Sequence, residues 1–181
     1  MRLIAITTLL LLSALSAAAQ SADAIQKSLK THAETIQAWG SDKDLVAAVK
    51  AQNARKVPAS EVQRIDQAWI AGKEGALVRQ LTTSSCADRL RQLIATHPAF
   101  GETMLMDDQG ALVCASEKTS DYWQGDESKW QRGFDGGKGA VFIDRPRFDD
   151  SAVANLAQIS VPVVEGGKVI GVLTVGVDIR K

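Results

Sequence analysis

The chain has 181 residues and a mass of 19.4 kDa, and its 45% hydrophobic and 23% charged residues are typical of a soluble globular protein, which excludes a disordered tail or a coiled-coil rod. Its 21 Lys and Arg balance its 21 Asp and Glu, and no basic run occurs, so the charge pattern of a nucleic-acid-binding protein is missing. Two Cys and two His, with no CxxC or HxxxH spacing, exclude a Cys/His zinc site. We expect no metal, no cofactor and no nucleic-acid partner.

The first 19 residues have the pattern of a secretory signal peptide. Arg2 supplies a positive charge before the leucine-rich run from Leu3 to Leu15, and the small residues from Ser16 to Ala19 suit a signal peptidase. We expect cleavage after Ala19 and a mature protein in the periplasm or outside the cell. Retention of the segment as a membrane anchor is the alternative.

Export would place Cys86 and Cys114 in an oxidising compartment, where two thiols can form a disulfide. The alternative is two buried thiols that pack as small hydrophobic side chains. The sequence does not give the distance between them, so both possibilities stay open.

The first half of the chain is patterned as helices. Apolar residues recur every three or four positions up to Gly40, which ends an amphipathic helix. Ser41 is a suitable cap for the next helix, and Pro58 and Pro98 each interrupt the helical pattern. The expected helices are residues 22–39, 41–54, 60 to the glycine at 72, and a longer one over 76–96.

After Pro98 the hydrophobic period changes from helical to strand-like, which marks the main boundary in the chain. The turn sequences at Asp107 to Gly110 and at Glu165 to Gly167 each predict a hairpin. In the last strand one face is apolar, whereas the other is mixed and carries small residues near its middle. The expected strands are residues 102–106, 111–116, 139–144, 155–164 and 168–179. The class is therefore α+β, with N-terminal helices packed on an antiparallel sheet in one domain.

Four stretches of the second half carry a specific pattern: residues 107–116, 119–127 with Trp130, 150–152 and 159–173. This pattern resembles a Cache domain, and more narrowly the PAS-like extracytoplasmic sensor domains of bacterial receptors that are called PDC sensors. The most specific part is the run Ser-Asp-Tyr-Trp-Gln-Gly-Asp-Glu at residues 120–127. The resemblance assigns residues 77–181 to the sensor domain and leaves 20–76 as an N-terminal helical segment.

The resemblance implies a long helix against one face of a curved, five-stranded antiparallel sheet, with a small-molecule pocket on the other face. In membrane receptors of this kind, ligand closure reaches a cytoplasmic module through a second transmembrane helix. This chain stops at Lys181 without such a helix, so we expect it to relay ligand occupancy in signal transduction or chemotaxis through a membrane receptor.

The acidic and aromatic run after residue 120 is the first candidate ligand site. Tyr122, Trp123 and Trp130 offer large rigid surfaces with one polar group each, and Gln124 and Asp126 lie among them. The indole rings of Trp123 and Trp130 would suit a cationic ligand such as an amine. The alternative is structural, with Trp130 on a short helix that packs against the sheet.

Arg145 and Arg147 flank Pro146, and in an extended segment both would point the same way, like a clamp for the carboxylate of an organic acid. Pairing with the nearby aspartates is the alternative. Asp150 and Ser151 match the family motif, either as ligand contacts or as residues that hold the loop.

Thr174 is a hydroxyl residue on the mixed face of the last strand and a candidate for the floor of the pocket. No GxSxG, HExxH or phosphate-binding loop occurs, so we expect no catalysis. The expected ligand is a small organic acid or an amine or amino acid. The rival function is a protein-interaction or homodimerisation module with a vestigial pocket, which would leave an apolar stripe uncovered on the first helix.

Overall fold

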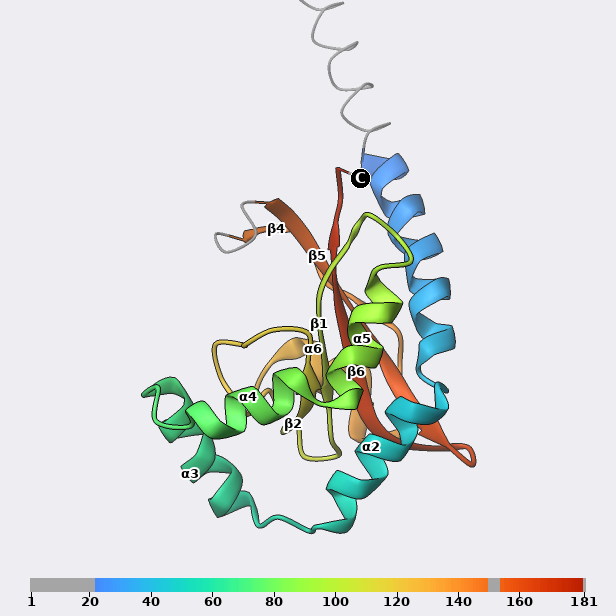
Figure 1. The fold of residues 1–181 in the computed structure, drawn as a ribbon. Helices are drawn as coiled ribbons and strands as arrows, with labels where there is room; N and C mark the ends of the chain where they lie inside the picture. The colour runs from blue at the N-terminus through green and yellow to red at the C-terminus, as the bar shows by residue number, and fades with distance from the viewer. Residues whose placement is uncertain (1–21, 150–153, 181) are drawn as a thin grey trace, which may run out of the picture.

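The computed structural model describes residues 22–149 and 154–180. Helices precede an antiparallel sheet and pack against it, so the predicted α+β class is confirmed (Figure 1). The predicted signal segment and the candidate residues Asp150 and Ser151 lie outside the described residues.

The helical half contains a long helix over residues 22–39, followed by α2 (Lys43–Ala54), α3 (Ala59–Ile70), α4 (Gly75–Thr83) and α5 (Ser85–Ile94). The predicted helix over 76–96 is wrong as a single helix, because Ser84 has an extended backbone with ψ 162°. Its hydroxyl accepts the N–H of Ala87 and caps α5. The cap of α2 is Asp42 rather than Ser41, since the Asp42 carboxylate accepts the N–H groups of Asp44 and Leu45.

The sheet has the strand order β2-β1-β6-β5-β3, and β4 pairs with another part of β5. Both predicted hairpins are present: β1 pairs with β2, and β5 with β6, antiparallel. The predicted strand over 139–144 is only two residues long, because the N–H groups of Gly139 and Ala140 donate to the carbonyls of Phe134 and Gly133 instead of a neighbouring strand. The strand β4 was not predicted. The strands are β1 (Phe100–Met106), β2 (Leu112–Ala115), β3 (Phe142–Ile143), β4 (Arg147–Asp149), β5 (Ala154–Glu165) and β6 (Lys168–Asp178).

The main hydrophobic core lies between one face of the sheet and the helix over 22–39 with α2 and α5 (Figure 1). Leu29, Ala33 and Ile36 are buried there, so the apolar stripe of the described part of the first helix is covered. A disulfide joins Cys86 on α5 to Cys114 on β2, with 6.0 Å between their Cα atoms.

The second face of the sheet is only partly covered. Helix α6 (Ser128–Phe134) packs on β5 and β6 at one end of this face, and Gly133 lies so close that a Cβ atom there would be 2.8 Å from Val172. Further along the same face, Leu156 and Gln158 of β5 are not fully buried and border open space. This uncovered part of the face is where a ligand can lie.

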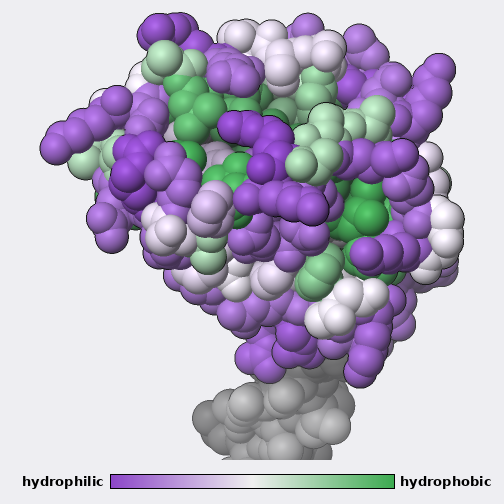
Figure 2. All heavy atoms as spheres, turned by 90° about the horizontal axis from the view of Figure 1, so that it is seen from below, coloured by the Kyte–Doolittle hydropathy of each residue, from purple (hydrophilic) through white to green (hydrophobic). Residues whose placement is uncertain are grey.

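The surface seen from below is mostly polar, with hydrophobic residues in separate patches (Figure 2). Among the described residues, no helix combines the length and apolarity that crossing a bilayer requires.

Candidate ligand site

Two adjoining hollows, of about 430 and 380 Å³, lie over the uncovered part of the sheet. They share Glu127, Lys129 and Gln158, so these three residues lie where the hollows meet. Each volume is in the range of small-molecule sites. The first hollow is also lined by Asp126, Ser128, Asp144, Arg145, Arg147 and Leu156, and the second by Glu102, Met104, Lys118, Thr119, Ser120 and Gln124.

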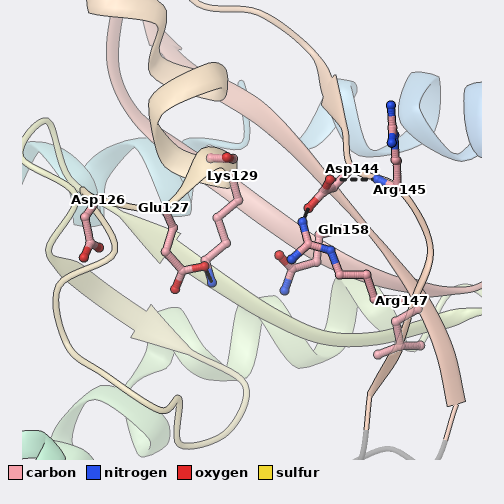
Figure 3. A pocket seen from close by; sticks show the side chains of 9 residues that line it. Asp126, Glu127, Lys129, Asp144, Arg145, Arg147 and Gln158 are labelled. Carbon is pink, nitrogen blue, oxygen red and sulfur yellow. Dashed lines mark hydrogen bonds and ion pairs between the residues drawn. The ribbon is translucent and has the colours of Figure 1, made fainter.

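Lys129 is a buried cation at the meeting point of the hollows. Its side chain is only 8% exposed, and its Nζ lies 3.0 Å from Oε2 of Glu127, whose side chain is 41% exposed. Figure 3 shows the amino group extending from the start of α6 toward the Glu127 carboxylate. Because a buried ammonium is costly without a partner, Glu127 stabilises Lys129 in this position.

Sequence reasoning missed Lys129. A signal was nevertheless present, because a lysine in the first turn of a helix is disfavoured by the helix dipole. Lys129 occupies that position directly after the run that carries the family resemblance. A residue that works against local stability in such a run is a candidate for binding.

Both predicted arginines line the first hollow, but their side chains do not point the same way. The Arg147 guanidinium donates to Oδ2 of Asp144 at 2.8 Å and lies beside Gln158, whereas the Arg145 side chain points away (Figure 3). The Asp144 carboxylate also accepts the backbone N–H of Arg145. Asp144 therefore holds both the Arg147 guanidinium and the backbone of Arg145, as the alternative of pairing with nearby aspartates predicted for Arg147.

The three predicted aromatic residues lie outside the two hollows. Tyr122, Trp123 and Trp130 line neither hollow, and Tyr122 is buried against Trp69 with 5.9 Å between ring centroids. The indole Nε1–H of Trp123 donates to the backbone carbonyl of Gln109 at 2.8 Å, and the indole Nε1–H of Trp130 donates to the backbone carbonyl of Asp107 at 3.0 Å. The two indole N–H groups thus hold residues 123–130 against the β1–β2 turn.

Two aspartates support the same segment. Oδ1 of the half-buried Asp66 on α3 accepts the backbone N–H groups of both Tyr122 and Trp123 at 2.9 Å, and no sequence pattern predicted this role. Burial raises the pKa of Asp107, and it raises the pKa of Tyr122 to about 12. The hydrogen bonds from the N–H groups of Gln109 and Ala111 to Asp107 oppose its shift and fix the turn.

The remaining predicted residues divide between the hollows and the core. Gln124 lines the second hollow and is fully buried. Asp126 lines the first hollow but is exposed and stands apart from Lys129 (Figure 3). Thr174 lines neither hollow: it is buried, and its hydroxyl pairs with that of Ser160 at 2.9 Å. Over the described ranges, no group of three or more His, Cys, Asp or Glu side chains is arranged to hold a metal ion.

No protein-family model and no curated protein matches this chain. Solved structures do show similarity. The sensor domain of the V. cholerae histidine kinase DctB has 13% identity and a TM-score of 0.45 over 92% of this chain and 56% of that one. The sensory domain of the Campylobacter jejuni chemoreceptor Tlp3, with isoleucine bound, has 15% identity and a TM-score of 0.39 over 87% and 62%.

The ligand-binding domain of the Pseudomonas aeruginosa PAO1 amino acid chemoreceptor PctC, in complex with GABA, has 17% identity and a TM-score of 0.39, over 62% of this chain and 58% of that one. This chain thus spans less than two thirds of the length of each of these three domains. These three are sensor or ligand-binding domains of a histidine kinase and of chemoreceptors.

Proposed function

We propose that this protein is a non-catalytic, exported sensor that binds a small anionic metabolite in the two joined hollows. The observation that carries the proposal is the buried ammonium of Lys129, which lies where the hollows meet and has an exposed carboxylate, Glu127, as its partner. A ligand anion can share Lys129 with Glu127 or replace it there.

The charge at the opposite side of the first hollow supports an acid as the ligand. Arg147 extends from β4 toward the hollow, and its guanidinium is held by Asp144 (Figure 3). Lys129 and Arg147 therefore present cations from two different segments, and either can meet the carboxylate of an organic acid or an amino acid. An aromatic cage for an amine is not supported, because the indole rings of Trp123 and Trp130 lie outside the hollows.

Ligand binding would connect segments that are distant in sequence. The first hollow is bordered by the start of α6, by the chain between β3 and β4, and by β5. A ligand in contact with all three would hold them in one arrangement and change the surface that a partner meets. We propose a membrane receptor as that partner, with the signal segment removed on export.

The rival function, an interaction module with a vestigial pocket, predicted an uncovered apolar stripe on the first helix. In the described part of that helix, Leu29, Ala33 and Ile36 are buried in the core. Covered apolar residues and an open hollow both favour ligand binding.

A thermal-shift screen of the protein, refolded to remove any co-purified ligand, tests the proposal. The probes are acetate, propionate, succinate, alanine and aspartate, with putrescine as a cationic comparison. An acid present at 100 times its Kd should add about 2.7 kcal/mol of stability. A shift with putrescine alone, or with none of the probes, would contradict the proposal.

A further inference from the structure

Gln124 contains a hydrogen-bond acceptor that the fold leaves unused. The residue is 0% exposed, and its Oε1 atom has no hydrogen-bond partner within the described residues. Leaving a buried acceptor unpaired costs about 1–3 kcal/mol. An unpaired atom of this kind beside a hollow therefore needs an explanation.

The orientation of the amide is fixed by its surroundings. Its Nε2 donates to two acceptors of Asp121, the backbone carbonyl at 3.0 Å and the carboxylate Oδ1 at 2.5 Å. Turning the amide over would place its oxygen against these two oxygens, so the nitrogen stays with Asp121. The oxygen is then the group left for another molecule.

Gln124 and Lys129 line the same hollow and offer opposite chemistry. Lys129 presents a buried cation, while Gln124 presents a neutral acceptor that has no partner in the described part of the chain. A simple carboxylate satisfies Lys129 and leaves Oε1 of Gln124 unpaired. A ligand that also carries an N–H or O–H group satisfies both.

We propose that Gln124 determines specificity by selecting acids that carry a hydrogen-bond donor. This inference rests on the proposed function and adds the chemical class of its ligand: a small carboxylate with a hydroxyl or ammonium group, held by Lys129 at the anion and by Oε1 of Gln124 at the donor. Because Oε1 is sealed from solvent, the side chains that line the second hollow have to move apart before a donor can reach it.

The test compares acids of equal skeleton by calorimetric titration. Propionate has no donor, pyruvate has an additional acceptor, and lactate and alanine add a hydroxyl or an ammonium; succinate, malate and aspartate form a second set. We expect the better of the two donor-bearing acids in a set to bind about ten-fold more tightly than the acid without a donor. If lactate binds more tightly than alanine, the preferred donor is a hydroxyl, and the reverse order of affinity indicates an ammonium.

The variant Gln124→Met removes the acceptor at similar side-chain length, and Gln63→Met, at an exposed position on α3 outside both hollows, is its control. The ten-fold preference should disappear in Q124M and persist in Q63M. If the unaltered protein binds neither lactate nor alanine more tightly than propionate, the inference is overturned and the proposed function still stands. This outcome does not depend on whether Q124M folds. Absence of binding by every acid would overturn both.

Discussion

Nε1 of Trp130, on α6, donates to the backbone carbonyl of Asp107 in the β1–β2 turn at 3.0 Å. This bond ties the helix that carries Lys129 to the β1–β2 hairpin of the sheet. The Trp130 ring also stacks on Phe134 of the same helix, with 5.0 Å between centroids. The position of the candidate anion site therefore depends on a residue that does not line it.

Replacing Trp130 by phenylalanine should keep the stacking and remove one of the two donors to the Asp107 carbonyl, which still accepts the N–H of Gly110 at 3.2 Å. We expect a loss of about 1 kcal/mol in the free energy of unfolding, which is the usual net contribution of one hydrogen bond. Urea unfolding of W130F measures this loss. A free energy equal to that of the unaltered protein would show that the bond does not hold α6.

Removing the disulfide should destabilise the protein without altering the site. Cys86 and Cys114 are 28 residues apart, and a crosslink over such a loop contributes about 3–4 kcal/mol by restricting the unfolded chain. The double variant Cys86→Ser with Cys114→Ser should unfold at correspondingly lower denaturant, and the oxidised unaltered protein is the control. Coincident unfolding curves for reduced and oxidised protein would contradict this expectation.

Acid should destabilise the contact between the first helix and the sheet. The centroid of the His32 ring lies 4.8 Å from that of His97. The pKa of His32 is lowered mainly by burial and to a smaller extent by repulsion from His97. The folded protein then binds fewer protons than the unfolded chain, whose histidine titrates near 6.5, so stability is complete above that pH and falls as the pH drops below it. His32→Gln should flatten the pH dependence of unfolding between pH 7 and 5, and an unchanged slope would exclude this cause.

Arg147 and Arg145 provide a matched pair for the first hollow. Both are exposed and both line the first hollow, but the Arg147 guanidinium pairs with Asp144, whereas the Arg145 side chain points away from that pair (Figure 3). Arg147→Ala should change stability by at most about 1 kcal/mol, as for other exposed ion pairs, and should weaken acid binding. Arg145→Ala should weaken binding less. Equal effects of both variants on the Kd would contradict this difference between the two arginines.

The sequence was sufficient for the architecture because hydrophobic period and turn residues act locally. Asp107 to Gly110 and Gly166-Gly167 gave both hairpins, and the change of period after Pro98 separated helices from sheet. The break at Ser84 was not predicted, because the apolar face continues across it into α5 and periodicity alone indicates one helix.

The site was predicted less well, because residue type does not reveal how a side chain is used. Trp123 and Trp130 have the properties of ligand contacts, yet their N–H groups are taken up by backbone carbonyls of the hairpin. Lys129 was overlooked because a lysine in a polar run normally lies on the surface. Its burial depends on Glu127 and on the placement of α6 over the sheet, which are tertiary features.

Calorimetric titration of Lys129→Met with the tightest-binding acid tests the central claim most directly, with Lys138→Met, an exposed lysine outside both hollows, as control. Methionine keeps the length of the side chain and removes its charge, and the released Glu127 is exposed enough to be solvated, so the fold should tolerate the change. We predict that K129M loses about 2 kcal/mol or more of binding free energy, roughly 30-fold in Kd, while K138M binds normally. Unchanged affinity in a folded K129M protein would contradict the assignment of this site.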